Sequence, residues 1–415
     1  MNKTPGLPAR QGALKLIDAV LRRGETLEQA ERAALKPIRG PADKALARAL
    51  AGETLRWLAD LDALIDSATK KRLPDDAKPR AVLRLMLAGW LRLDTPPHAV
   101  IATGLPLLAG GPRRLAHGVF STLTEREVAL PEVPTLPVAV QMRWGEGASE
   151  IAKGLGDPPP LDLCLKDISE TSARAVAMGG ETLGPGNIRL PRGTPIDRLP
   201  SFEEGAWWVQ DLAAQIPASL LGDGSGKRAL DLCAAPGGKT MQLASCGWQV
   251  TALDISERRL DMLRENLSRT GLAAEIVCAD ALSYTPGKAF DAILIDAPCT
   301  ATGTCRRHPD VLHRVGPRQI EEMVEIQRAL AERAIGWMRS GDVLVYAVCS
   351  LESEEGEEQA IWIEQQFGLE RLPVTADELP QGSEPTVEGW VRTDPGMLEQ
   401  DGGLDGFFVA RWRKR

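Results

Sequence analysis

Residues 228–240 read RALDLCAAPGGKT. The apolar start of this stretch predicts a buried strand. The small residues and two glycines that follow predict a tight loop whose backbone can approach a ligand closely. A helix that begins after the loop would offer free N–H groups to a polar or anionic group. This stretch therefore predicts the strand–loop–helix unit of an α/β fold that binds a ligand.

The loop departs from two common phosphate-binding patterns. It is not Gly-x-Gly-x-x-Gly, and it lacks the first glycine that a Walker loop requires before Lys239-Thr240. Neither a dinucleotide nor a nucleoside triphosphate is therefore expected as the natural ligand. A nucleoside cofactor without a pyrophosphate fits the loop better.

Further apolar runs alternate with helical patterns after this unit, at 249–253, 274–278, 292–295 and 343–347. Such alternation predicts an α/β fold with a doubly wound parallel sheet and right-handed crossovers. Asp254 and Asp280 follow two of these strands, where nucleotide-binding folds place an acid on the ribose hydroxyls. Any one of these acids could instead simply cap a strand end or a turn. Three acids near one glycine-rich loop, namely Asp231, Asp254 and Asp280, favour a binding site.

Two cysteines end the last two of these runs. Cys299 closes Asp296-Ala297-Pro298-Cys299, and Cys349 follows Val348. Since ligands bind beyond the carboxyl ends of parallel strands, two thiols and one carboxylate are expected in one crevice. A thiolate is a strong nucleophile, so this set indicates covalent chemistry. Cys164, Cys246 and Cys278 are expected to be small buried hydrophobic residues, while Cys305 stays undecided.

Composition narrows the class of protein. The chain has 415 residues, 43% hydrophobic and 26% charged, which suits two or three globular domains. Seven cysteines without a Cys-x-x-Cys pair argue against a zinc ribbon and a disulfide framework, and no metal site is implied. No signal peptide and no run long enough to span a bilayer is visible. We expect a soluble cytoplasmic protein without a membrane partner, and no oligomer is implied.

The charge is unevenly distributed. The net charge is −8, yet residues 1–127 carry +7 and the remainder −15. The basic part favours a nucleic-acid partner, although solvated Lys and Arg on a helical domain are an equally good interpretation of charge alone. Helical periodicity predicts an all-α domain over 1–128. A small α+β segment over 136–222, with helices at 138–155 and 202–221, leads to a catalytic domain over 223–415.

Several motifs together resemble one family. They are the loop with its strand at 231–240, the segments at 296–299 and 303–310, the cysteine segment at 349–357, and the ending at 405–410. These segments resemble the motifs of RNA cytosine-5 methyltransferases of the Sun/Fmu type. The segments at 48–56 and 96–99 resemble the NusB-like domain of the family's bacterial small-subunit rRNA members.

The resemblance implies a Rossmann-like methyltransferase domain, S-adenosylmethionine as cofactor, and RNA, most naturally 16S rRNA, as partner. Cys349 would be the nucleophile that attacks carbon 6 of cytosine, Cys299 would assist release, and Asp296 would contact both base and cofactor. The implied cofactor site comprises Cys233, Ala234, Ala235, Pro236, Gly237, Gly238, Lys239, Asp254, Asp280 and Asp296.

Alternatives remain at this point. DNA cytosine-5 methyltransferases use the cysteine of a Pro-Cys motif, here Cys299, and the chemistry of the residues alone does not choose between the two thiols. A tRNA or DNA substrate, or a non-catalytic RNA-binding scaffold, stays open. Thr300-Ala301 stands where the family usually has Ser-Gly, and Val348 replaces a common Thr. Arg306, Arg307 and His308 are candidates for phosphate contacts, with a solvated loop as the alternative.

Overall fold

A computed structural model describes residues 5–415, apart from the side chain of Asp197. Packing groups the chain into two units. The helical unit extends to Asp157 and also includes Cys305–Val315, and the second unit comprises Pro158–Thr304 and Gly316–Arg415. The three-part division at 128 and 222 stays a prediction. Within 5–415, no helix has the length and apolar composition needed to cross a bilayer.

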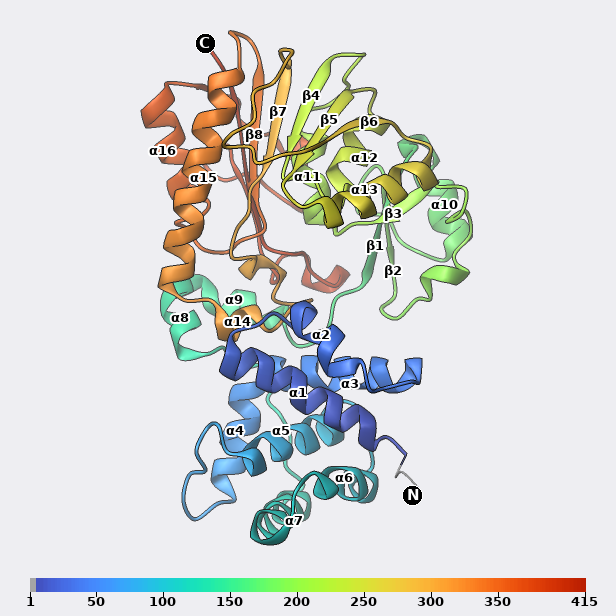
Figure 1. Cartoon of the computed structure of the whole chain (residues 1–415), viewed down its shortest axis with the longest axis vertical. Helices are drawn as coiled ribbons and strands as arrows, with labels where there is room; N and C mark the ends of the chain where they lie inside the picture. The colour runs from blue at the N-terminus through green and yellow to red at the C-terminus, as the bar shows by residue number, and fades with distance from the viewer. Residues whose placement is uncertain (1–4) are drawn as a thin grey trace. The chain divides into compact units, whose positions relative to one another are not determined.

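The helical unit is all-α, as its apolar periodicity predicts (Figure 1). One buried cluster is built around Trp57, Leu87 and Phe120 and another around Leu16 and Leu50. Its helices are α1 (Leu7–Arg23), α2 (Leu27–Leu35), α3 (Pro41–Arg56), α4 (Leu58–Ser67), α5 (Lys78–Leu91), α6 (Pro97–Gly104), α7 (Gly110–Glu125), α8 (Val138–Trp144), α9 (Ala148–Lys153) and α14 (Val311–Arg314). The helix predicted over 138–155 is thus two helices, because Gly145 has a positive φ of 54° between them.

The second unit contains the predicted Rossmann-like sheet. The order is β10-β11-β8-β7-β4-β5-β6, and β9 pairs with β11. Its strands are β4 (Arg228–Leu232), β5 (Gln249–Asp254), β6 (Ala274–Cys278), β7 (Ala292–Asp296), β8 (Val343–Val348), β9 (Glu370–Arg371), β10 (Val391–Thr393) and β11 (Phe407–Arg413). The strands from β4 to β8 are parallel, whereas β11 joins β8 in antiparallel fashion. The predicted runs therefore form the parallel part of the sheet, and β11, to which the sequence analysis assigned no strand, adds an antiparallel edge.

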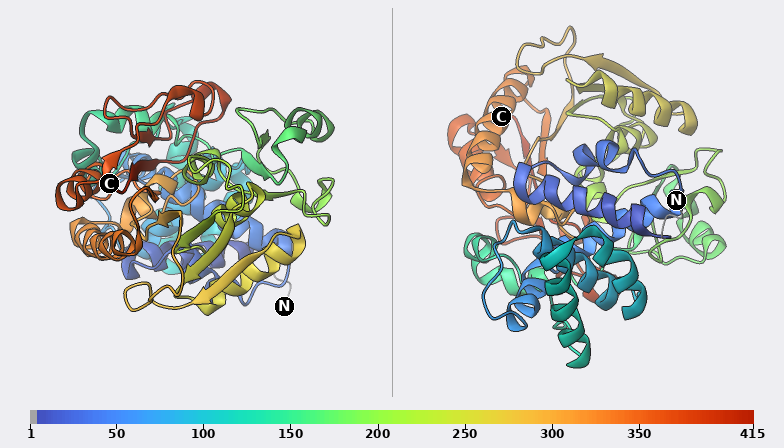
Figure 2. Two further views of the ribbon diagram at one scale, coloured as in Figure 1. Left: turned by 90° about the horizontal axis from the view of Figure 1, so that it is seen from above. Right: turned by 60° about the horizontal axis from the view of Figure 1, so that its bottom comes forward.

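Helices cover both faces of the sheet (Figures 1 and 2). Helices α15 (Pro317–Trp337) and α16 (Glu357–Phe367) pack on one face through residues such as Leu330 and Ile363. Helices α11 (Leu212–Ser219), α12 (Gly238–Ser245) and α13 (Glu257–Thr270) pack on the other. Successive strand residues alternate between faces, so Ala229 contacts one helical layer and Leu230 the other. Ser256 and Gly271 cap α13, as expected.

A small antiparallel sheet with order β2-β1-β3 precedes the large one. Its strands are β1 (Leu161–Leu165), β2 (Asn187–Leu190) and β3 (Trp207–Val209), with helix α10 (Thr171–Met178) beside β2. The predicted helix over 202–221 is wrong in its first half. Trp207 and Trp208 instead pair with β1, since aromatic residues favour a half-buried strand, and α11 begins after its N-cap Asp211.

Candidate active site

The loop between β4 and α12 is held against the end of β5. The Ala234 N–H donates to the carbonyl of Leu253 at 3.1 Å, and the Ala235 N–H donates to Oδ2 of Asp254, also at 3.1 Å. Cys233 and Gly237 both have positive φ, of 61° and 106°. The left-handed conformation at Gly237 costs little because glycine has no Cβ. The loop therefore turns sharply and leads directly into α12.

Two acids lie buried beside this loop. Asp231 is fully buried, and its Oδ2 accepts a hydrogen bond from the Thr240 hydroxyl at 2.6 Å. Burial raises the pKa of Asp231 to about 7. Its Oδ1 has no hydrogen-bond partner among the described residues. Asp254 is 2% exposed and also accepts from the Ser256 N–H at 2.9 Å, so its carboxylate fixes the mouth of the loop.

Asp280 lies one strand further along this edge. It is exposed, and its Oδ1 accepts from the Leu282 N–H at 2.9 Å. The neighbouring Ala279 N–H donates to the Asp254 carbonyl at 3.2 Å, which links the ends of β5 and β6. Asp254 and Asp280 thus lie at the same edge of the sheet, where the sequence analysis predicts that a nucleoside binds.

An ion pair joins the loop to the end of β7. Nζ of Lys239 lies 2.8 Å from Oδ2 of Asp296. Burial by itself would lower the pKa of Lys239, but Asp296 outweighs burial and the pKa is raised. The ammonium group also lies 5.3 Å from the ring centroid of Phe407, and the same ring belongs to the cluster that contains Cys349. Lys239 therefore stays charged between the carboxylate and the thiol.

The two strand-end thiols are adjacent. Sγ of Cys299 lies 3.4 Å from Sγ of Cys349, and both side chains are half-buried. The hydrogen bond to Cys349, followed by burial, raises the pKa of Cys299 well above its usual value. A thiol that keeps its proton is a weak nucleophile and can act as a proton donor. The pair therefore includes at least one thiol, Cys299, whose surroundings favour its protonated form.

A buried carboxylate holds the two cysteine segments together. Glu355 accepts hydrogen bonds from the Thr300 N–H at 2.9 Å and the Ser350 hydroxyl at 2.5 Å. It also accepts from the Thr300 hydroxyl and from Nε2 of Gln327, the latter at 3.0 Å. Burial raises the pKa of Glu355. Sequence reasoning assigned this residue no role, because nothing in the run of acids after Cys349 marks the one that is buried.

A cavity of about 430 Å³ lies beside the loop, within the range of about 300 to 1,000 Å³ that is usual for small-molecule sites. It is lined by loop residues with Lys239 and Asp296, and by the aromatic and amide side chains of Trp208 and Gln210. The indole N–H of Trp208 donates to Oε1 of Gln210 at 2.7 Å. Cys299, Cys349, Asp254 and Asp280 are not on its wall. The sequence analysis did not single out Trp208, and it gave Gln210 no role in a site although the segment around Gln210 resembles the family's entry to the catalytic domain.

The remaining predicted residues lie elsewhere. Arg306 is buried within the helical unit, Arg307 is half-buried and His308 is exposed, so a wholly solvated loop is wrong. Cys164 is buried, as expected. Cys246 is only half-buried, and Cys278 is exposed because it ends β6 at the edge of the sheet, so the expectation of burial is wrong for these two residues. Cys305 is buried.

Comparison with known proteins gives two family matches. The family described as 16S rRNA methyltransferase RsmB/F matches residues 218–413, and the NusB family matches residues 7–107. Ribosomal RNA small subunit methyltransferase B of Citrobacter koseri is 31% identical over 98% of this chain and 99% of that protein. The protein of the same name from Klebsiella pneumoniae is 32% identical over 98% of each chain.

Solved structures agree in fold. PH0851 matches with a TM-score of 0.69 and 21% identity over 98% of this chain and 99% of that one. A methyltransferase homolog protein from Pyrococcus horikoshii matches with a TM-score of 0.57 and 27% identity, covering 67% of this chain and 93% of that one. The likeness to PH0851 concerns the fold alone.

Proposed function

The chain belongs to the RsmB/F family of S-adenosylmethionine-dependent 16S rRNA methyltransferases, and from this premise we propose that it methylates carbon 5 of a cytosine through a covalent adduct with Cys349. The observation that carries the proposal is the pair of thiols 3.4 Å apart at the ends of adjacent strand segments. Carbon 5 of cytosine is a poor nucleophile, so the reaction needs a group that first adds to the ring.

Cys349 supplies that group. Its thiolate forms a bond to carbon 6, and the displaced π electrons make carbon 5 nucleophilic. Carbon 5 then takes the methyl group, and loss of the carbon-5 proton drives out the Cys349 thiolate and restores the ring.

Cys299 assists release. Its hydrogen bond to Cys349 and its burial raise its pKa, which favours the neutral thiol as a proton donor. Beside Cys349 it can hand a proton to the departing sulfur or take part in removal of the carbon-5 proton. Asp296 hydrogen-bonds the edge of the base and stabilises its protonated form, while its ion pair with Lys239 fixes its direction.

The loop 233–239 with Asp254 and Asp280 suits the methyl donor. S-adenosylmethionine supplies an electrophilic methyl group when it is bound. The carboxylates of Asp254 and Asp280 fit ribose hydroxyls and an adenine edge, and the unpartnered Oδ1 of Asp231 fits a hydrogen-bond donor near the loop. The N-terminus of α12 fits a carboxylate. The target base must leave its stack to reach this site.

Position-resolved bisulfite sequencing of RNA from a deletion strain tests the proposed function. One cytosine of the 16S rRNA is expected to lose its 5-methyl group, and expression of this chain is expected to restore it. A Cys349→Ala protein should bind S-adenosylmethionine yet leave the cytosine unmethylated. An unchanged rRNA map, or restoration by the Cys349→Ala protein, would refute the proposal.

A further inference from the structure

The thiols of Cys299 and Cys349 lie close enough to be joined by a covalent bond. Their sulfur atoms are 3.4 Å apart, and a disulfide requires a separation of about 2.0 Å. The strands that lead to them, β7 and β8, are hydrogen-bonded neighbours in which Asp296 pairs with Ala347. Neighbouring strands are about 4.8 Å apart, within the range of about 4.4 to 6.8 Å between the Cα atoms of disulfide-bonded cysteines. The bond therefore needs only a small closing movement.

Other contacts keep the two cysteine segments side by side. Glu355 accepts hydrogen bonds from the Thr300 N–H and the Ser350 hydroxyl, and these two residues directly follow the two cysteines. The Gly303 N–H donates to the Cys349 carbonyl at 3.1 Å. Groups that the fold holds together in this way react with each other as if at a very high concentration. The second thiol is therefore in place before any oxidant arrives.

The pair is accessible as well as close. Cys299 and Cys349 are half-buried rather than sealed in the core. A site that admits a nucleobase to the Cys349 sulfur also admits a peroxide, which is much smaller. Cys278 is exposed too, but its thiol lies beside the Glu257 side chain and the Ile255 carbonyl. Exposure and a neighbouring thiol thus come together at the ends of β7 and β8.

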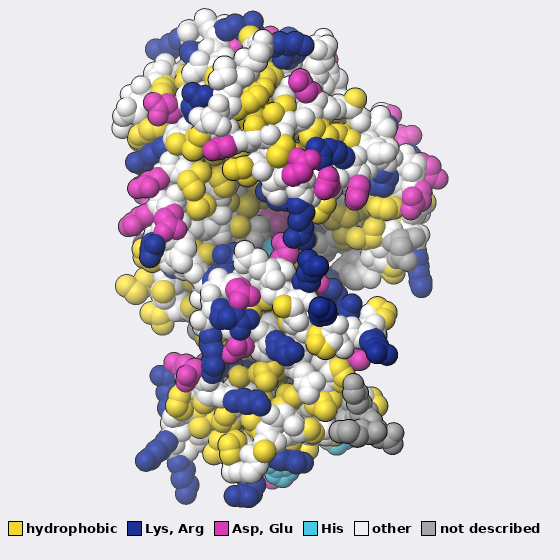
Figure 3. Space-filling model, in the orientation of Figure 1, with side chains coloured by type: hydrophobic (Ala, Val, Ile, Leu, Met, Phe, Trp, Pro, Cys, Tyr) yellow, Lys and Arg dark blue, Asp and Glu magenta, His cyan; other side chains and the backbone are white. Residues whose placement is uncertain are grey.

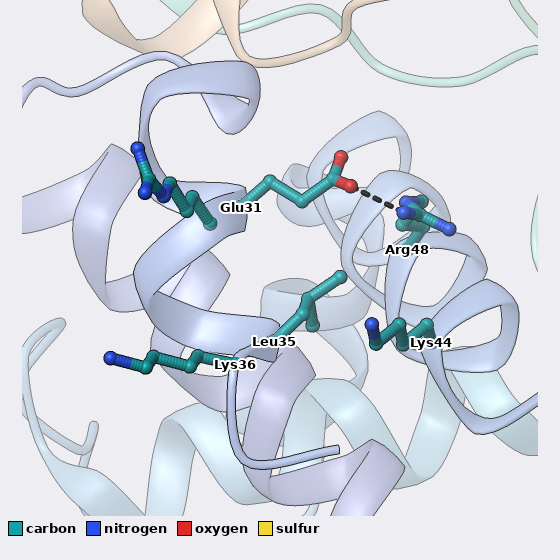
Figure 4. Close-up of a pocket in the computed structure, with 6 residues that line it drawn as sticks. Glu31, Leu35, Lys36, Lys44 and Arg48 are labelled. Atoms are coloured by element: carbon teal, nitrogen blue, oxygen red, sulfur yellow. Dashed lines mark hydrogen bonds and ion pairs between the residues drawn. The ribbon is translucent and has the colours of Figure 1, made fainter. Parts of the chain in front are cut away.

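The surface elsewhere offers charge rather than paired thiols. Lys, Arg, Asp and Glu side chains are scattered over the face shown in Figure 3. The concave site between α2 and α3 in Figure 4 is lined by four cations, one carboxylate and Leu35, and an ion pair joins Glu31 to Arg48 there. Such a site gives an oxidant of thiols nothing to react with.

We propose that Cys299 and Cys349 form a reversible disulfide in the presence of a peroxide, and that this bond switches methyl transfer off. The disulfide ties up the sulfur that attacks the base, so the enzyme stops until a thiol reductant restores both cysteines. The inference rests on the proposed function in one respect, namely that methyl transfer needs the free Cys349 sulfur. Formation of the bond itself depends only on the two thiols and the peroxide.

The reaction consumes one peroxide and releases two waters. The Cys349 sulfur attacks a peroxide oxygen, so that an S–O bond forms, the O–O bond breaks and the sulfur is oxidised to a sulfenic acid. The departing hydroxide takes up a proton and leaves as the first water. The Cys299 sulfur then gives up its proton and attacks the sulfenic sulfur, and the S–O bond breaks to release the second water. A small dithiol reverses the bond by exchange and is itself oxidised.

Cys299 also protects Cys349 from permanent damage. A sulfenic acid that meets no second thiol is oxidised further to sulfinic and sulfonic acids, which thiol reductants do not reverse. Because Cys299 is only 3.4 Å away, capture of the sulfenic acid is expected to be faster than a second encounter with peroxide. Cys299 thus has a use in addition to its part in release of the product.

The test exposes the full-length enzyme, without RNA, to hydrogen peroxide and then to dithiothreitol. Intact mass and peptide mapping report the state of the cysteines, and methyl transfer to a small-subunit rRNA transcript reports activity. The variant Cys299→Ser removes the second thiol of the pair. The control Cys278→Ser removes the exposed thiol outside the site.

The wild type and Cys278→Ser are expected to lose two hydrogen atoms, to yield a peptide that links Cys299 to Cys349, and to lose methyl transfer until dithiothreitol restores it. In Cys299→Ser, Cys349 should gain two or three oxygen atoms and keep them after dithiothreitol.

Three results would overturn the proposal: a linked peptide that joins a different pair of cysteines, full methyl transfer by the linked enzyme, or recovery of the Cys349 thiol in Cys299→Ser. The link is mapped without methyl transfer, so its absence counts against this inference alone. Failure of the untreated enzyme to form 5-methylcytosine counts against the proposed function instead.

Discussion

At the residue scale, the two thiols of the site are distinguished by their surroundings. Cys299 and Cys349 touch through sulfur, but only Cys349 lies in the cluster with Phe407, the ring beneath Lys239. The hydrogen bond to Cys349 and burial raise the pKa of Cys299. The sequence placed both cysteines at strand ends but had no means to show this difference, because it arises from residues far apart in the chain.

The variant Cys299→Ala is expected to remain attached to RNA. Without the second thiol, Cys349 can add to the base but is released slowly. Denaturing gel electrophoresis of enzyme mixed with the rRNA transcript and S-adenosylmethionine should show a shifted band. The control Cys278→Ala removes an exposed thiol instead and should release normally. If no denaturant-resistant band forms with Cys299→Ala, Cys299 does not act in release.

Glu355 is predicted to position both thiols. Oε1 of Glu355 accepts the bond from the Thr300 N–H and Oε2 accepts the bond from the Ser350 hydroxyl, so in Glu355→Gln the amide nitrogen replaces one of these two acceptors and that bond is lost. Hydrogen bonds to a charged group contribute about 1.5 to 3 kcal/mol, so kcat should fall by about 10- to 100-fold.

The control Glu354→Gln changes the exposed neighbour and should have wild-type activity. The KM for RNA should stay the same in both variants. In Glu355→Gln the rate of adduct formation at Cys349, measured with Cys299→Ala as background, should drop in parallel with kcat. A fall in thermal stability with normal adduct formation would reduce Glu355 to a structural residue.

At the scale of elements, one loop contact fixes the segment after Cys299. The Gly303 N–H donates to the Cys349 carbonyl at 3.1 Å, and the Gly406 N–H donates to the Gly303 carbonyl at 2.8 Å. A Cβ on Gly303 would lie 1.9 Å from the Gly406 carbonyl oxygen. The segment before β11 and both cysteine segments thus meet at a point that tolerates no side chain.

Gly303→Ala is therefore expected to separate the segments and to abolish most methyl transfer, with a lower melting temperature. Gly287→Ala is the matched control, because a Cβ there meets nothing within 4 Å. Methyl incorporation into rRNA and thermal unfolding are measured for both. Equal activity in the two variants would contradict the described packing at Gly303.

Most elements could be predicted because their signals are local. Alternating apolar runs identified β4 to β8, and Ser256 and Gly271 marked the ends of α13. The strand β3 was missed, since its pairing with β1 is a tertiary contact that local helical periodicity does not report. For the same reason the antiparallel position of β11 and the burial of Glu355 could not be predicted.

At the scale of the whole molecule, a piece of the catalytic half of the sequence folds with the helical unit. Nε2 of His313, from Cys305–Val315, lies 2.7 Å from the Leu55 carbonyl oxygen of α3. The side chain of Arg56 donates to the carbonyls of Leu155 and Arg306, at 2.8 and 2.7 Å. The chain that follows Cys299 therefore leads directly into Cys305–Val315, which packs within the helical unit. Neither the spacing of the motifs nor the charge distribution could show this packing.

His313 predicts a pH dependence of stability. Burial lowers its pKa below the value of about 6.5 expected for the unfolded chain. As the pH falls, the imidazole of His313 therefore takes up a proton in the unfolded chain at a higher pH than in the folded protein. The free energy of unfolding is at its full value above pH 6.5. Below that pH it declines by about 1.4 kcal/mol per pH unit until the pH reaches the pKa of His313 in the folded protein.

Urea unfolding from pH 8 to pH 5 measures this effect. His313→Gln should be less stable than the wild type at pH 8, and the difference should shrink towards pH 5. His117→Gln, at an exposed position, should follow the wild type. A constant difference between His313→Gln and the wild type across this range would contradict the account.

The central claim concerns the sulfur that attacks the base, and a suicide substrate tests it most directly. A transcript containing 5-fluorocytidine blocks removal of the group at carbon 5, so the adduct persists after methyl transfer. Peptide mapping by mass spectrometry is predicted to find the nucleotide on Cys349, with no adduct in Cys349→Ser. A nucleotide attached to Cys299, or an undiminished adduct in Cys349→Ser, would contradict the claim.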